Sequence, residues 1–184
     1  MESTQSRRNS TTTIGVDVAI TRSAHLFSAE GVMGATPLKL RGRRKYFSKR
    51  WKIEGEVGDG HVEIELCAHS RLHHGGTVTG RWGSETVDLD AQLERIEGRI
   101  QGRFGSSELE LFPKRRIQGV IAVAGPRASG LELSVGREGP TMQGESPTHR
   151  EAAGLLLALP CLWRGGAETT AWAYYLEPLH KVQF

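Results

Sequence analysis

The residues best suited to chemistry lie in one short segment, KLRGRRKYFSKRWK, at residues 39–52. The segment contains eight Lys and Arg and no acid, in a chain whose formal net charge is only +3. Lys and Arg bind phosphates, and aromatic side chains interleaved with them stack on bases or insert into a membrane interface. We therefore expect a surface for an anion or a partner here. Its residues are Arg41, Arg43, Arg44, Lys45, Tyr46, Lys49, Arg50 and Trp51.

A plainer interpretation of the same segment stays open. Apolar residues alternate from Phe47 through Val57, as they do in a strand that enters a core. On this interpretation the basic stretch is a solvated connector between two hairpins, and Phe47 and Trp51 are core residues. Anion binding, if it occurs, should weaken steeply as salt is added.

Histidines gather close to a cysteine further along the chain. Imidazole and thiolate are ligands for zinc and other transition metals, which makes a weak candidate set of Cys67, His69, His73 and His74. Their spacing matches no standard structural zinc pair, and residues 70–76 have the composition of a hairpin connector. We expect neither a metal nor a cofactor.

The sequence identifies no catalytic residues. It lacks a Gly-x-Ser-x-Gly nucleophile motif, and its GRWGSE and GRFGSS stretches lie within expected hairpins rather than between a strand and a helix. The acids fall mostly in alternating rows on strands, without the contrasting environments that a general acid and base need. Cys161 and His149 are twelve residues apart, and on one helix they would be too far apart to act together unless Pro160 breaks it. We therefore favour a non-enzymatic protein, without excluding an enzyme.

Five related stretches position these residues. They read AEGVMGATPLKL from Ala29, IEGEVGDGHVEIEL from Ile53, VTGRWGSETVDL from Val78, IQGRFGSSELEL from Ile100 and IQGVIAVAGPRASGLEL from Ile117. Apolar and polar residues alternate on both arms of each stretch, which predicts β-hairpins with one buried and one solvated face. A glycine within a strand costs stability unless the strand bends or another group approaches closely, so we expect such features at the strand glycines.

The spacing around the turns predicts a register. In four copies the last apolar residue before the turn and the first after it are five positions apart, which fits a four-residue connection with these residues facing each other. The pairs are Met33 and Leu38, Val57 and Val62, Trp82 and Val87, and Phe104 and Leu109. Opposite charges on the solvated arms should favour the same pairing.

The cores VTGRW and IQGRF, about 23 residues apart, resemble the Tyr-x-Gly-x-Trp centre of MORN repeats. The resemblance covers about five positions in each of three copies, and the chain lacks that family's second glycine pair after the turn. It implies an elongated sheet of hairpins that serves membrane attachment or protein assembly.

These patterns predict a mainly β fold, an antiparallel meander of repeated hairpins that forms a barrel or sandwich, with one C-terminal apolar helix packed on it. An open, single-layer stack of hairpins is the second choice. We expect a disordered tail at residues 1–13, then one domain at 14–184 with hairpin repeats over 29–136, about eleven strands in all, and a final strand at about 169–176.

The expected helix spans about residues 148–159. Thr148 and Glu151 have capping-box spacing, and the following residues are apolar nearly all round, so the helix must be buried and should plug or cover the sheet. A buried strand at 152–159 is the alternative.

For function we favour a binding or assembly module that acts through protein–protein contacts, with self-association and exposed sheet edges as the means. Two alternatives are a nucleic-acid or anionic-membrane binder acting through residues 39–52, and a container for a small apolar ligand inside a barrel. The first thirteen residues lack the apolar centre of a secretory signal, so we expect a cytoplasmic protein. The longest apolar run, Ala152–Trp163, is shorter than the roughly 20 residues of a membrane-spanning helix.

Overall fold

A computed structural model describes residues 13–45, 47–69, 74–94, 97–116, 119–124, 130–136 and 139–162. These residues form strands and one helix. The strands are β1 (Ile14–Arg22), β2 (Leu26–Met33), β3 (Thr36–Arg44), β4 (Arg50–Val57), β5 (Gly60–Ala68), β6 (His74–Trp82), β7 (Glu85–Glu94), β8 (Glu97–Phe104), β9 (Ser107–Arg116), β10 (Gly119–Ala124), β11 (Gly130–Gly136) and β12 (Gly139–Ser146), and the helix is α1 (His149–Leu162). The expected tail, apart from Thr13, and the expected strand at 169–176 lie outside the described residues.

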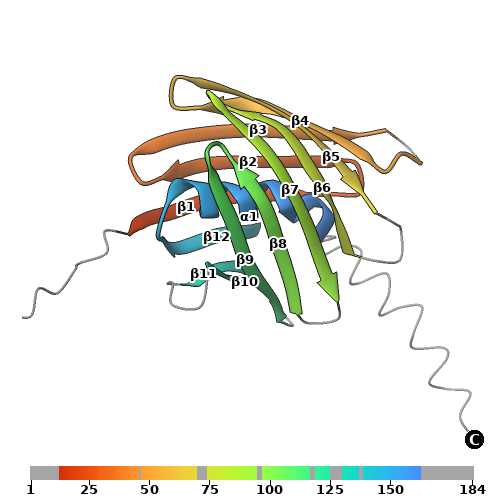
Figure 1. Cartoon of the computed structure of the whole chain (residues 1–184). Helices are drawn as coiled ribbons and strands as arrows, with labels where there is room; N and C mark the ends of the chain where they lie inside the picture. Colours follow the sequence, from red (N-terminus) through yellow and green to blue (C-terminus); the bar gives the residue numbers. More distant parts are fainter. Residues whose placement is uncertain are drawn as a thin grey trace, which may run out of the picture.

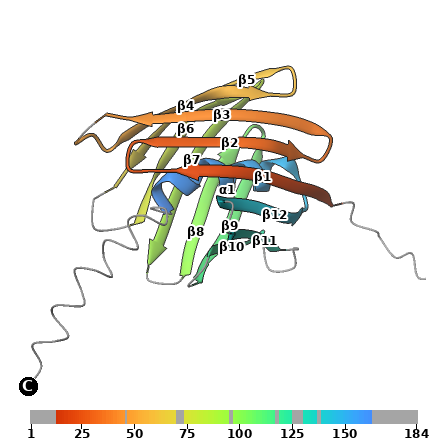
Figure 2. The same cartoon turned by 180° about the vertical axis from the view of Figure 1, so that it is seen from behind.

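The strands form an antiparallel meander that closes into a barrel (Figures 1 and 2). Each strand pairs with the next in the chain, and β1 pairs with β12, with Ile14 opposite Ser146 and Ala19 opposite Thr141. Strands β1 to β9 together with β12 curl around the helix, and β10 and β11 complete the ring. The expected mainly β fold and hairpin meander are confirmed. The open stack of hairpins, and the elongated sheet that the MORN resemblance implied, are wrong.

The register at the hairpin turns differs from the expected one. Met33 lies opposite Thr36, and Leu38 lies opposite Gly31, because the turn has two residues instead of four. The three following copies repeat this arrangement, and a glycine with positive φ comes first in every turn, as type II′ connections require. These turn glycines are Gly34, Gly58, Gly83 and Gly105, with φ of 63°, 54°, 60° and 61°.

The strand glycines mark close approaches between backbones. A Cβ at Gly80, whose φ is 144°, would lie 2.2 Å from the carbonyl oxygen of Glu63 on the preceding strand. Gly102 has the same relation to Asp88, also at 2.2 Å. Any side chain at these positions would collide with backbone, so the expected close approach is confirmed.

Helix α1 begins at His149, where the capping-box spacing predicts, with Thr148 as the N-cap residue. The Thr148 hydroxyl oxygen accepts a 3.2 Å hydrogen bond from the Arg150 backbone N–H and contacts the Glu151 carboxylate. The expected end at residue 159 is too early, because the helix continues through Pro160 to Leu162. In the last turn a proline removes only one backbone hydrogen bond, so the surrounding barrel wall can hold the helix in shape.

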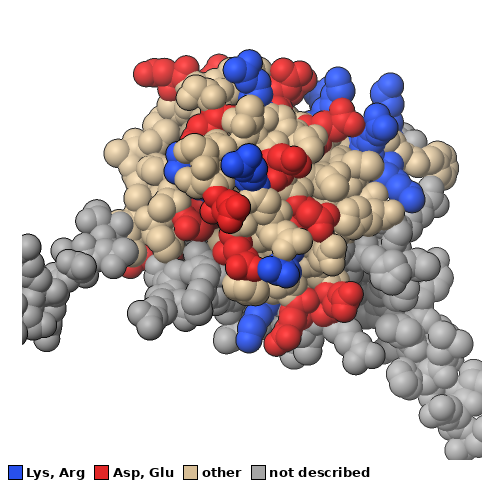
Figure 3. Space-filling view, in the orientation of Figure 1, with Lys and Arg blue, Asp and Glu red and all other residues tan. Residues whose placement is uncertain are grey.

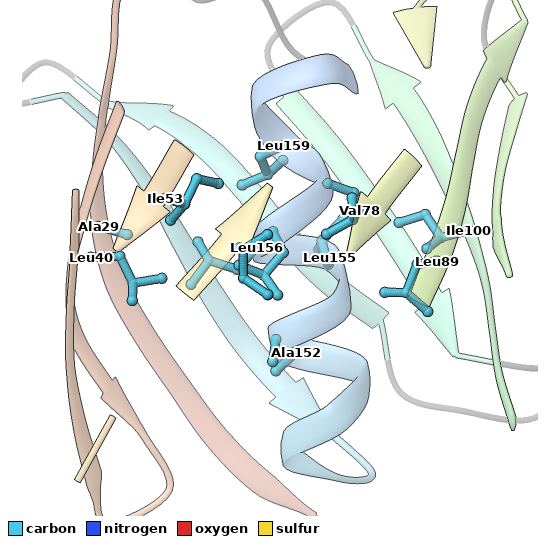
Figure 4. Packing of buried hydrophobic residues seen from close by; sticks show 14 of the residues in the cluster. Ala29, Leu40, Ile53, Val78, Leu89, Ile100, Ala152, Leu155, Leu156 and Leu159 are labelled. Carbon is cyan, nitrogen blue, oxygen red and sulfur yellow. The ribbon is translucent and has the colours of Figure 1, made fainter. Parts of the chain in front are cut away.

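The helix occupies the interior of the barrel. Every residue from Ala152 to Leu162 is buried, and the helix packs mainly on β6, β7, β8 and β9. Its leucines lie between Ile53 on one wall and Val78 on the other (Figure 4). The helix therefore plugs the barrel, which confirms the expected burial and rules out the alternative strand at 152–159. It also fills the space that the ligand-container hypothesis assigns to a small molecule.

The two thiols are free and differ in exposure. Cys67 is half-buried near the end of β5, whereas Cys161 is buried in the last turn of α1. Burial raises the pKa of the Cys161 thiol to about 12, which keeps the thiol protonated and unreactive at neutral pH. Within the described part of the chain, no helix combines the length and apolarity needed to cross a membrane.

Candidate functional site

The candidate site lies at the end of the barrel where α1 terminates. The β3–β4 connection, residues 45–49, projects from this end, which is at the right in Figure 1. We call residues 45–49 the basic loop. The helix reaches the same end, since Arg22 at the end of β1 donates a 3.1 Å hydrogen bond to the Pro160 carbonyl.

Several hydrogen bonds fix the shape of the basic loop. The Ser48 N–H donates to the Lys45 carbonyl at 3.1 Å, which closes a turn, and the Arg50 N–H donates to the Ser48 hydroxyl at 3.0 Å. The Lys49 carbonyl accepts a 2.9 Å hydrogen bond from the Ala68 N–H on β5. The loop is therefore tied to its own backbone and to the neighbouring strand.

Phe47, at the tip of this turn, has an unusual backbone conformation and an unusually exposed side chain. Its side chain is 87% exposed, and its backbone has a φ of 62°, in the left-handed region. That region costs a bulky L-residue about 1–2 kcal/mol, and glycine or asparagine normally occupies it. The fold thus holds an apolar ring in solvent at a conformational cost.

Cations surround Phe47 on both strands and on the loop. Arg43 on β3 lies directly opposite Lys52 on β4, a like-charged pair that stabilises neither strand. Lys45 and Lys49 follow on the loop, and both are exposed. Figure 3 shows Lys and Arg side chains gathered at this end of the visible face.

Most of these cations have no acidic partner. Lys39 pairs with Glu30 at 3.2 Å and Arg50 with Glu65 at 3.4 Å, on the outer face. Among the described residues, no side-chain hydrogen bond or ion pair involves the four remaining cations, which lie on β3, on β4 and at the first position of the loop. These are Arg41, Arg43, Lys45 and Lys52. Arg41 and Lys52 lie opposite Glu54 and Glu65 in the register, which offsets part of their charge. Arg43 and Lys45 have no such neighbour among the described pairs, so their charge is the most available to a ligand.

A shallow groove of about 680 Å³ runs along the outer face between β3 and β4. Arg41 and Lys39 line one wall and lie opposite Glu54 and Glu56 on the other. Towards the basic loop both walls become basic, because Arg43 faces Lys52. The groove is thus mixed in charge at its far end and positive where it meets the loop.

Two of the expected site residues have a different role. Trp51 is 1% exposed and belongs to the core, and Arg44 is half-buried. Both the Arg22 and the Arg44 guanidinium groups stack on the Trp51 ring, at 4.5 Å and 5.3 Å from its centroid. Trp51 thus fits the core interpretation, whereas Phe47 does not.

The other expected binding residues are exposed around the loop, except for Tyr46, which lies outside the described residues. The exposed ones are Arg41, Arg43, Lys45, Lys49 and Arg50. The expected set omitted Phe47 and Lys52. Nothing in the sequence marks Phe47 as exposed, because its left-handed conformation is set by the turn and not by its residue type.

The weak metal candidates are only partly described. His69 Nε2 lies 3.2 Å from Asp90 Oδ1 on β7, and Cys67 is two residues before His69, on β5. His73 lies outside the described residues, and only the backbone of His74, opposite Leu93, is described. In the described ranges no three His, Cys, Asp or Glu residues come together as metal ligands would.

Closure of the sheet changes the expected docking surfaces. Every strand of the ring pairs on both sides, so the described strands leave no unpaired edge for an added strand. Docking at sheet edges, which we expected for an assembly module, therefore has no structural basis.

A scan against protein-family models, a search of curated proteins and a search of solved structures each found no match to this chain. The similarity to MORN repeats is accordingly confined to a motif of about five positions in three of the copies.

Proposed function

We propose that the protein is a non-enzymatic binding module that docks on anionic membrane surfaces through the basic loop and the cations beside it. Phe47 carries the proposal, because it combines an exposed apolar ring with a disfavoured backbone. Strained residues of this kind persist where they serve a function. Interfacial membrane sites pair apolar side chains that enter the headgroup region with cations that attract acidic lipids.

A second apolar side chain supports a membrane as the partner. Leu26, the first residue of β2, is 56% exposed. It lies opposite Arg43 on the neighbouring strand β3. Aliphatic side chains enter a bilayer interface readily but contribute little to stacking on bases. The pair Phe47 and Leu26 therefore fits a lipid surface better than a nucleic acid.

The expected affinity is modest. Each Lys or Arg near an acidic membrane contributes about 1 kcal/mol, and insertion of one Phe side chain contributes about 2 kcal/mol. Four unpaired cations and one ring then give about 6 kcal/mol, which corresponds to a Kd between about 1 mM and 1 μM. Such binding is reversible and sensitive to salt, as suits a cytoplasmic protein that meets the acidic inner leaflet.

The proposal is tested by sedimentation of the protein with vesicles of phosphatidylcholine alone or mixed with phosphatidylserine. We expect binding only to the acidic vesicles, with a steep loss between about 0.1 M and 0.5 M salt. The double variant Arg43→Gln, Lys45→Gln should weaken it by at least about tenfold. The matched control, Arg81→Gln with Arg103→Gln, makes the same change in net charge on β6 and β8, away from the loop and without placing a new acid opposite Glu63, Asp88 or Glu108, and should keep it.

Other outcomes would overturn the proposal. Equal binding to both vesicle types, or equal loss in the two double variants, would show that the loop is not the site. Binding to single-stranded RNA but not to acidic vesicles would favour the nucleic-acid alternative. Binding to neither, with a dimer in size-exclusion chromatography, would favour self-association.

A further inference from the structure

Three side chains connect the basic loop to the end of the plug helix. Trp51 is the second residue of β4, and the guanidinium groups of Arg22 and Arg44 lie against its ring. Arg22 also donates to the Pro160 carbonyl in the last turn of α1. A continuous set of contacts thus runs from α1 through Arg22 to Trp51 and Arg44.

The charges in this cluster have local compensation. Two guanidinium groups close to one ring repel each other, and the negative face of the indole offsets part of that repulsion. The C-terminal end of a helix carries partial negative charge on its last carbonyls, so Arg22 gains further stabilisation from α1. The helix end therefore contributes to holding Arg22 against Trp51.

The cluster also fixes both ends of the basic loop. Arg44 is the last residue of β3 and lies opposite Trp51 in the register, with the loop between them. The Arg44 N–H donates a 3.0 Å hydrogen bond to the His25 carbonyl in the β1–β2 connection. Each end of the loop is thus bound to groups inside the mouth of the barrel.

We propose that Arg22, Arg44 and Trp51 are positioning residues that hold the basic loop in its binding conformation by connecting it to the end of α1. This inference rests on the membrane-docking function proposed above. A strained residue such as Phe47 keeps its conformation only when its surroundings over-determine it. The stack supplies that constraint at the two points where the loop leaves the sheet.

A matched pair of variants tests the inference, because each end of α1 is connected to the barrel by one half-buried arginine. Arg22 holds the C-terminal end. Arg150 holds the N-terminal end, where its Nε donates to Glu85 and its Nη1 to Ser107, both at 2.9 Å. Arg22→Gln and Arg150→Gln each remove one charge and one connection to the helix.

Hydrogen exchange of the amides whose hydrogen bonds hold the loop is the first readout. We expect Arg22→Gln to speed exchange of the Ser48 and Ala68 amides by about tenfold, because local opening requires less free energy once the loop ends are released. Arg22→Lys, which keeps a cation beside the carbonyl and the ring, should restore most of the protection. Arg150→Gln should leave these amides unchanged.

Affinity for phosphatidylserine vesicles is the second readout. Arg22→Gln should weaken binding several-fold although no surface cation or apolar side chain has changed, and Arg150→Gln should not. Equal effects of the two variants on loop exchange would show a general loss of stability and overturn the inference. Unchanged exchange in Arg22→Gln would also overturn it. The exchange measurement needs no vesicles, so it stands apart from the outcome of the membrane test.

Discussion

Phe47 has an aromatic ring that is 87% exposed and a backbone in the left-handed region, which is disfavoured for a bulky residue. The same turn with asparagine at this position would be more stable and more polar. On our proposal, Phe47 therefore favours membrane binding at the expense of stability. A single substitution at this position can then change binding and stability in opposite directions.

Phe47→Asn should raise the free energy of unfolding by up to about 1 kcal/mol, because asparagine tolerates the left-handed conformation. The same variant should weaken binding to phosphatidylserine vesicles, since the inserted ring is gone. Chemical denaturation and vesicle sedimentation measure the two effects. Phe47→Ala is the control: it removes the ring but keeps the backbone strain, so it should lose binding without the gain in stability. A stability loss in Phe47→Asn would show that the ring supports the fold.

At the residue scale the sequence predicts the cations well and the aromatics poorly. Arg41, Arg43 and Lys45 are exposed as expected, because a run of charge without acids must be solvated. Phe47 and Trp51 differ because one falls in the turn and the other at an inward position of β4. Which of the two enters the core depends on where the strand begins, and alternation alone does not give that position.

At the scale of the secondary-structure elements, the repeated hairpin is the unit from which the barrel is built. The turn glycine and the strand glycine of each hairpin have separate roles. The turn glycine permits a two-residue connection, and the strand glycine permits close approach of the preceding strand. The sequence predicts the buried faces correctly although it predicts the wrong turn length. A register shift of two residues moves the pairing but leaves every side chain on its original face.

Gly80→Ala should lower the free energy of unfolding by about 3 kcal/mol or more, since its Cβ would overlap the Glu63 carbonyl and its φ of 144° is strained for alanine. Gly15→Ala on β1 is the matched control, because nothing lies within 4 Å of a Cβ built there. Thermal or urea denaturation of both variants measures the difference. Equal effects would show that the close approach at Gly80 does not constrain the sheet.

At the scale of the whole molecule, the described residues place cations without an ion pair at one end of the barrel. The outer rows on β7 to β9 contain acids that face or pair with arginines, such as Arg99 with Glu110 and Arg103 opposite both Asp88 and Glu108. At the basic end, Arg43 lies opposite Lys52 instead of an acid, and Lys45 has no ion pair among the described residues. On our proposal, we expect the attraction of the molecule for acidic surfaces to be strongest around the basic loop.

Closure of the barrel is the global feature that the sequence leaves open. Local alternation predicts each hairpin and the helix, whose apolar surface all round requires burial. The pairing of β1 with β12 joins residues more than 120 positions apart, such as Ala19 and Thr141, and no local pattern encodes it. Because α1 fills the interior of the ring, the sheet can close around a packed core.

The central claim is that the tip of the basic loop enters an acidic membrane, and the Phe47→Trp variant tests it most directly. This substitution adds one indole at the tip, and the wild-type protein supplies the baseline for its native tryptophans. With phosphatidylserine vesicles, we predict a blue shift of the added emission and quenching by brominated lipid chains, both absent with phosphatidylcholine alone. Emission from the variant that changes no more than that of the wild-type protein would contradict the account.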